Sequence, residues 1–226
     1  MKQSQTNRMV SRRSSLLAFL TPISGLGLLS FHEHALAGGQ VEEPIADAVR
    51  NALNAALREN KPPEPVFRDT ESRLHYARWK IEMSKRLVDR KSDLKTWQDR
   101  DDFLQTVWYN SKRAGLDTAL VLGLIQVESN FREYAVSVVG ARGYMQVMPF
   151  WMRGLPDGEV GKLFHMQINL RFGCMILRHY LDRERGDLFM ALGRYNGSRG
   201  KAAYPDAVLG AKRAWEFTAK SPSGPS

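Results

Sequence analysis

The feature that most constrains this chain is the run of apolar residues over 119–127, which ends at Glu128. Gly115 precedes the run, and Asp117 or Thr118 can accept hydrogen bonds from the first free N–H groups of a helix that reaches about Glu128. Because this helix is apolar nearly all round, it belongs in the centre of a folded domain. The sequence therefore predicts a central buried helix with a carboxyl group at its end.

Most of the chain after residue 40 has the pattern of helices and turns. Apolar residues four positions apart predict an amphipathic helix over 44–60, and further helices are predicted over 71–89 and 103–114. The predicted buried positions of these three helices are Ile45, Val49, Leu53 and Leu57, then Leu74, Trp79, Met83 and Leu87, then Leu104, Val107 and Trp108. Alternating strand patterns are scarce, so the predicted fold class is mainly α. A Pro-rich linker is predicted near 61–65, and a disordered tail over 221–226.

Residues 1–37 have the composition of an export signal. Basic residues precede an apolar run over 16–29, and Ala35-Leu36-Ala37 offers a small-x-small cleavage point. The apolar run is shorter than the roughly 20 residues of a membrane-spanning helix, so no stable span is expected after cleavage. An uncleaved anchor or a buried helix is the alternative. The expected location is the periplasm or the cell exterior, and Ser11-Arg12-Arg13 leaves both the Sec and the Tat routes open.

The net charge and the cysteine and histidine content exclude few classes of function. The formal net charge is +9, which favours contact with polyanions in general. The basic residues are scattered without interleaved aromatic residues, so no nucleic-acid partner is predicted. Cys174, the single cysteine, lies in an apolar helical stretch and is expected to be a small buried residue. No histidine pair after the signal has metal-ligand spacing on one helix face, so neither a metal nor another cofactor is predicted.

Glu128 is the candidate catalytic residue. Desolvation by apolar neighbours and the negative end of the helix dipole both raise the pKa of a carboxyl group. A carboxyl that stays protonated near neutral pH can act as a general acid. Taken alone, this helix favours the alternative of an ordinary glutamate that points to water.

A set of spaced motifs changes that balance. Their residues are Glu128-Ser129-x-Phe131, Ala135-x-Ser137-x-x-Gly140-Ala141-x-Gly143-Tyr144-Met145-Gln146-Val147-Met148-Pro149, Asn169-Leu170-x-x-Gly173 and Ala191-Leu192-x-x-Tyr195-Asn196-Gly197. In this order the motifs resemble the signature of the soluble lytic transglycosylase domain, over about 101–215. The resemblance implies a lysozyme-like domain over 101–220, behind an N-terminal helical extension over 38–100 of unknown duty. Tyr144 and Gly197 depart from the usual pattern, in which Leu stands at the first position and a small residue separates the Asn and Gly of the last motif.

The resemblance also implies a reaction. Members of the family cut the glycan strands of peptidoglycan between N-acetylmuramic acid (MurNAc) and N-acetylglucosamine (GlcNAc). Glu128 would first act as acid on the leaving oxygen and then as base on the 6-hydroxyl of the sugar, which leaves a 1,6-anhydro end. Other glycosidases add a second carboxylate. Here Glu133, Asp157 and Glu159 lie in loop-like stretches outside the family pattern.

The remaining site residues follow from the same resemblance. Ser137 and Gln146 would line the substrate cleft, with Ser137 near the acetamido group, and Tyr195 would face the catalytic glutamate. Asn169 is expected to be mainly structural, with contact to sugar also open, and Tyr144 would alter a sugar subsite. From the residues alone, Ser137 can also be a turn residue and Tyr195 a core aromatic residue.

Two rival functions fit the same sequence. One is a hydrolase similar to goose-type lysozyme that uses water on the same bond. The other is a wall-binding or assembly protein with a silent site, although the Glu128, Ser137, Gln146 and Tyr195 set is complete.

Overall fold

The computed structural model describes residues 40, 47–58, 61–88, 90 and 92–218, and these belong to one compact unit. This part of the chain is mainly helical, as predicted, and contains no β-sheet, only two isolated bridges that join Arg142 to Val136 and to Val147. The elements are α1 (Asp47–Ala56), α2 (Thr70–Val88), α3 (Trp97–Arg113), α4 (Thr118–Ser129), the 3-10 turns η1 (Pro149–Met152) and η2 (Val160–Phe164), α5 (Met166–Arg183), α6 (Leu188–Asn196) and α7 (Ala203–Arg213). The predicted signal and the predicted tail at 221–226 lie outside the described residues.

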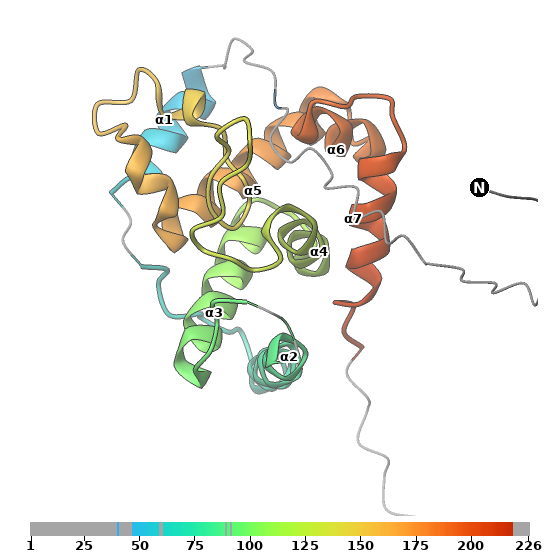
Figure 1. Ribbon diagram of the computed structural model, residues 1–226. Helices are drawn as coiled ribbons and strands as arrows, with labels where there is room; N and C mark the ends of the chain where they lie inside the picture. Colours follow the sequence, from blue (N-terminus) through green and yellow to red (C-terminus); the bar gives the residue numbers. More distant parts are fainter. Residues whose placement is uncertain (1–39, 41–46, 59–60, 89, 91, 219–226) are drawn as a thin grey trace, which may run out of the picture. The chain divides into compact units, whose positions relative to one another are not determined.

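The central helix is α4, as the apolar run predicted. Its N-cap is Asp117, whose side chain accepts a hydrogen bond of 2.9 Å from the backbone N–H of Ala119. Only Gln126 and Val127 within α4 keep partial exposure. Helix α3 packs along one side of α4, and α7 crosses it on another (Figure 1).

Close approach of α7 to α4 depends on a glycine. A Cβ atom at Gly123 would lie 2.6 Å from the backbone nitrogen of Lys212 and 2.8 Å from its Cα. These are backbone atoms, so neither helix can relieve the overlap by turning a side chain. Gly123 therefore sets how near α7 can come to α4, and α7 carries a residue of the site described below.

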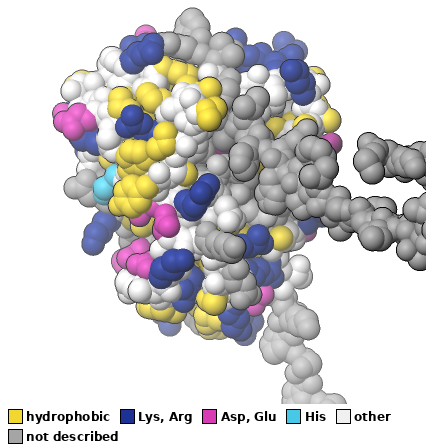
Figure 2. Space-filling view, in the orientation of Figure 1, with side chains coloured by type: hydrophobic (Ala, Val, Ile, Leu, Met, Phe, Trp, Pro, Cys, Tyr) yellow, Lys and Arg dark blue, Asp and Glu magenta, His cyan; other side chains and the backbone are white. Residues whose placement is uncertain are grey.

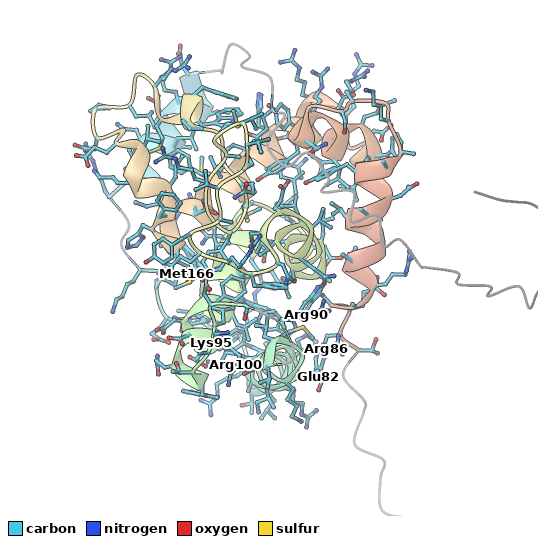
Figure 3. The ribbon with its side chains drawn as sticks, viewed as in Figure 1. Glu82, Arg86, Arg90, Lys95, Arg100 and Met166 are labelled. Carbon is cyan, nitrogen blue, oxygen red and sulfur yellow. The ribbon has the colours of Figure 1, made fainter. Side chains whose placement is uncertain are left out.

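Helices α1 and α2 pack on the rest of the unit. Helix α1 contacts α5, and α2 contacts α3. Tyr76 and Trp79 of α2 pack against Trp108 of α3, with ring centroids 5.0 and 4.8 Å from it. Arg86 of α2 also donates hydrogen bonds to the carbonyl oxygens of Ala214 and Glu216, beyond the end of α7 (Figure 3).

Two sequence predictions for these helices need correction. Leu74 was expected on the buried face of α2, but it is 48% exposed, and Tyr76 is buried in its place. The buried stripe is Tyr76, Trp79, Met83 and Leu87. Leu74 lies five positions before Trp79 and falls off this stripe, because helical neighbours are three or four residues apart.

Helix α3 begins earlier than its predicted start at 103. Thr96 and Asp99 form a capping box, in which each side chain accepts a hydrogen bond from the backbone N–H of the other. The polar first turns carry no apolar periodicity, so the sequence pattern missed them. The predicted border between extension and catalytic domain, at 100–101, thus falls inside a continuous helix.

The described surface carries mixed charge. Figure 2 shows Lys and Arg side chains spread over the visible face, with Asp and Glu between them. None of the helices in the described part of the chain combines the length and the apolar character that crossing a membrane requires.

We predict that Gly123→Ala lowers the free energy of unfolding by about 1–3 kcal/mol, because the new methyl group meets the backbone of α7. The matched control is Gly210→Ala in α7, where an added Cβ meets only the end of the Arg213 side chain, at 3.6 Å. That control should be neutral or stabilising by up to about 1 kcal/mol, since alanine favours helices. Urea denaturation measures both, and equal effects at the two positions would contradict the proposed close packing.

Candidate active site

The site is built around Glu128, at the carboxyl-terminal end of α4. The helix ends at once after it, because Asn130 and Phe131 both adopt left-handed backbone conformations, with φ of 49° and 61°. Ser129 ties this end to the following loop by donating a 2.7 Å hydrogen bond to the carbonyl oxygen of Tyr144. Glu128 is therefore held in the interior and is only 7% exposed.

Burial changes the acidity of this carboxyl group. Desolvation raises the pKa of Glu128 to about 8, against a smaller lowering by a hydrogen bond from Tyr204. The Tyr204 hydroxyl donates to Oε1 over 2.5 Å, whereas Oε2 is buried and has no partner among the described residues. Near neutral pH the group is protonated, and its proton is best placed on Oε2. The site can therefore hold and release one proton.

Tyr204 is a site residue that the sequence reasoning missed. It lies at the start of α7, is 3% exposed and reaches Glu128 from 76 positions away. The available signal was modest: Tyr204 precedes the buried Val208 by one helical turn, which places it on the inner face of α7.

The expected partner of Glu128, Tyr195, makes a different bond. Its hydroxyl donates to the carbonyl oxygen of Met145 over 2.7 Å. Burial raises the pKa of the Tyr195 hydroxyl, and the charge of Glu128 raises it further, so the two groups interact electrostatically. Tyr195 is thus a core aromatic residue that also interacts with the acid.

Asn169 anchors the loop that follows α4. Its Oδ1 accepts a 2.8 Å hydrogen bond from the backbone N–H of Met145, and its Nδ2 donates to the carbonyl oxygens of Arg142 and Leu163 over 2.8 and 2.7 Å. A Cβ at Gly143 would lie 2.3 Å from that Nδ2. Asn169 is fully buried, and its amide is engaged with backbone. In this arrangement its amide supports the backbone of the loop.

Ser137 and Gln146 also support the same loop. The Ser137 hydroxyl accepts a 3.1 Å hydrogen bond from the backbone N–H of Ala141, as expected of a turn residue. Gln146 has a left-handed φ of 46°, and its Nε2 donates to the carbonyl oxygens of Ala135 and Gly143. Ser137 keeps partial exposure and Gln146 is 2% exposed, so of the two Ser137 is the more open to a ligand.

Tyr144 lies in the core rather than at an open sugar subsite. It is 2% exposed, and its ring centroid is 5.0 Å from that of Phe103 in α3. Burial and the carboxylates Glu133, Asp93 and Asp99 raise the pKa of its hydroxyl, in that order. The aromatic residue therefore packs between α3 and the loop.

Two other chemically active groups make no contribution to the shifted pKa of Glu128. Glu133 has a raised pKa because of burial and the nearby Asp93 and Asp99, and its backbone N–H donates to Asp93. Cys174 is buried, as expected, and burial raises the pKa of its thiol to about 12. Within the residues that the structure describes, no three His, Cys, Asp or Glu side chains gather in a way that could hold a metal ion. A surface cavity of about 610 Å³, which Phe67 and Trp108 help to line, includes none of the site residues.

Comparison with known proteins places the site within a described family. The profile of the "Transglycosylase SLT domain" matches residues 105–217. The "Transglycosylase" of Enterobacteria phage PRD1 is 34% identical over 112 residues, which is 46% of this chain and 41% of that protein. "Membrane-bound lytic murein transglycosylase C" of Histophilus somni (strain 2336) is 35% identical over 104 residues, or 39% of this chain and 28% of the relative. The chain thus spans less than half the length of these relatives.

A solved structure is also similar. It is that of an inactive mutant of lytic transglycosylase Slt from Pseudomonas aeruginosa, with 19% sequence identity and a TM-score of 0.40. The match covers 78% of this chain and 36% of that one.

We predict that the Glu128→Gln variant becomes more stable than the wild-type chain as pH rises. From the ordinary pKa of 4.5 up to about 8, the folded chain keeps a proton that the unfolded chain releases, so wild-type stability falls across that interval. Glutamine removes this dependence, and the variant should gain a few kcal/mol over wild type between about pH 5 and pH 9. Urea denaturation at the two pH values measures it. A difference between variant and wild type that does not change with pH would mean that Glu128 is not buried in its folded environment.

Proposed function

Because the chain belongs to the transglycosylase SLT domain family, we propose that it is a peptidoglycan lytic transglycosylase. It would cleave the β-1,4 bond between MurNAc and GlcNAc and leave a 1,6-anhydroMurNAc end. The observation that carries the proposal is Glu128, a buried carboxyl with a pKa of about 8 and one oxygen left without a described partner. A general acid works best when its pKa lies near the working pH.

The proposed reaction needs one carboxyl group in two roles. Glu128 first donates its Oε2 proton to the glycosidic oxygen, the bond from that oxygen to the anomeric carbon breaks, and GlcNAc leaves as an alcohol. The acetamido oxygen of the substrate stabilises the positive charge at the anomeric carbon. Ionised Glu128 then takes the proton of the 6-hydroxyl, and that oxygen bonds to the anomeric carbon. The carboxyl ends protonated again, and no water is consumed.

Tyr204 supports both states of Glu128. Its hydroxyl donates to Oε1, so it stabilises the carboxylate that exists between the two steps. Burial acts in the opposite direction and returns the proton once the 6-hydroxyl is available. The balance of these two effects keeps the carboxyl capable of both losing and regaining a proton near neutral pH.

One observation on the described residues supports the anhydro product over hydrolysis. Desolvation and Tyr204 are the causes of the shifted Glu128 pKa, and no described Asp or Glu contributes to it. An inverting hydrolase needs a second carboxylate about 6.5–9.5 Å from the acid, and a retaining one needs it closer. For location, we propose the periplasm or the cell exterior, on the signal-like composition of residues 1–37.

We predict that Glu128→Gln lowers glycan cleavage by at least about 1,000-fold, because glutamine has no proton to donate. Mass spectrometry of digested peptidoglycan is the measurement. Wild-type products one water lighter than hydrolysis products are expected, and reducing-end products would make this chain a lysozyme-type hydrolase. Turnover of the variant within a few fold of wild type would remove Glu128 from its role.

We predict that Tyr204→Phe moves the alkaline limb of the activity profile to higher pH. The variant loses the hydrogen bond that lowers the pKa of Glu128, so the carboxyl stays protonated further into the alkaline range. The kcat should fall by roughly 10-fold, because the intermediate carboxylate loses a donor. The control is Tyr109→Phe, which removes a hydroxyl that accepts a hydrogen bond from Arg113. An unshifted profile would show that Tyr204 does not act through Glu128.

A further inference from the structure

The surface cavity of about 610 Å³ is formed between the segment that precedes α2 and the second half of α3. Phe67 and Trp108 provide aromatic walls, and Trp108 is half-buried. The Trp108 ring packs against the buried rings of Tyr76 and Trp79 in α2, so its position is fixed by the core. A wall held in this way keeps its shape before any ligand arrives.

The charged side chains that line this cavity are all cationic: Arg68, Lys112 and Arg113. Arg113 donates a 2.7 Å hydrogen bond to the Tyr109 hydroxyl on its own helix. Arg68 and Lys112 are exposed, and neither forms an ion pair with an acid of the described residues. Lys112 Nζ lies 4.9 Å from the centroid of the Trp108 ring. An anionic group can therefore approach Arg68 and Lys112 without displacing a described carboxylate.

A second cavity, of about 360 Å³, adjoins the first and has the opposite charge. The residues that line both are Phe67, Ser72, Trp108 and Lys112. The second cavity adds the exposed acids Asp69 and Glu71. Asp69 Oδ1 accepts a 2.7 Å hydrogen bond from the backbone N–H of Ser72, which orients this carboxylate. The joined surface thus offers two cations, an aromatic wall and two carboxylates in succession.

Charge complementarity selects a ligand that carries both a carboxylate and a free amino group on an apolar chain. The peptide stems of peptidoglycan have this combination, because they contain several carboxylates and a diamino acid. The glycan strand does not have it, since its amines are acetylated and its lactyl carboxyl is joined to the stem as an amide. The charged groups of the proposed substrate are therefore in its stems.

We infer that the joined cavities are a second binding site for the wall, which takes a peptide stem with its carboxylates toward Arg68 and Lys112. The alkyl part of the stem would lie along Phe67 and Trp108, with its amino group toward the acids of the second cavity. The inference rests on the proposed function and extends recognition from the glycan to the peptides. Contact at two points on one polymer makes the second contact intramolecular, so a weak stem contact still raises the total affinity.

This site would also give the N-terminal extension a role. Residues 65–72 supply one side of the joined cavities, and they precede the family match, which begins at residue 105. The other side is on α3, which the extension shares with the matched segment. Attachment to stems would thus depend on the part of the chain that lies outside the family profile.

The test is binding of the full-length Glu128→Gln chain to peptidoglycan immobilised on beads, since this variant is expected not to cleave what it binds. Adding Arg68→Gln and Lys112→Gln should weaken binding by roughly 5- to 10-fold, because two exposed ion pairs are lost. The matched control adds Arg58→Gln and Lys85→Gln instead. These exposed cations line neither cavity, and the control should keep its affinity.

The same measurement on glycan strands freed of their stems by an N-acetylmuramoyl-L-alanine amidase asks what the site recognises. These strands remain anionic, because the lactyl carboxylate is now free. The cavity double variant and its parent should bind them equally. Equal weakening on both polymers would overturn stem recognition. Unchanged binding of intact peptidoglycan by the double variant would overturn the site and leave the cavities to another occupant, such as an acidic protein segment.

A second double variant guards against a loss that comes from misfolding. Arg68→Lys with Lys112→Arg keeps both charges and should bind intact peptidoglycan within about twofold of the parent. Weakening as large as that of the glutamine pair would contradict recognition by charge.

Binding requires no turnover, so the experiment also separates the two proposals. A chain that binds stems in this pattern but forms no anhydro products would fail only the proposed function. A chain that forms those products and binds intact peptidoglycan equally with and without the two cations would fail only the inference.

Discussion

Burial of one carboxyl group at the end of α4 is the constraint on which the rest of the structure depends. An ionised Glu128 is costly in this apolar environment, so the group keeps its proton to about pH 8. Its one described hydrogen-bond partner is on α7, and α7 reaches the end of α4 only because Gly123 lets the two helices approach closely. A backbone requirement in the middle of α4 thereby positions the hydrogen-bond donor of a carboxyl group at its end.

The sequence predicted those features that have a local cause. The central position of α4 follows from its apolar composition, and the helical extension follows from spacing in residues such as Leu53, Met83 and Leu87, all of which are buried. Glu128 as candidate acid needed both the helix and the motifs around it. The early start of α3 had a local signal too, in Thr96 and Asp99, but it was hidden among polar residues.

What the sequence could not supply were contacts made by tertiary packing. Tyr204 and Glu128 are 76 positions apart, and Gln40 and Trp151 are 111 apart, so no spacing rule connects them. The motif residues also hold the backbone, which the sequence did not specify for each of them. Asn169, Gln146 and Ser137 each use polar atoms to hold the loop after α4, which suggests that the motif specifies the shape of that loop as much as contacts with a ligand.

The continuity of α3 has a consequence for how this domain can be moved between proteins. The family match begins at residue 105, whereas α3 begins at Trp97, behind its capping box, and Trp108 packs against α2. A unit cut at the family border would begin inside a helix, without its cap and with the aromatic face of α3 uncovered. In this chain the segment that matches the family is therefore shorter than the segment that packs as a unit. Recombination at the border of sequence similarity would transfer the motifs without the part of α3 and the α2 surface that pack against them.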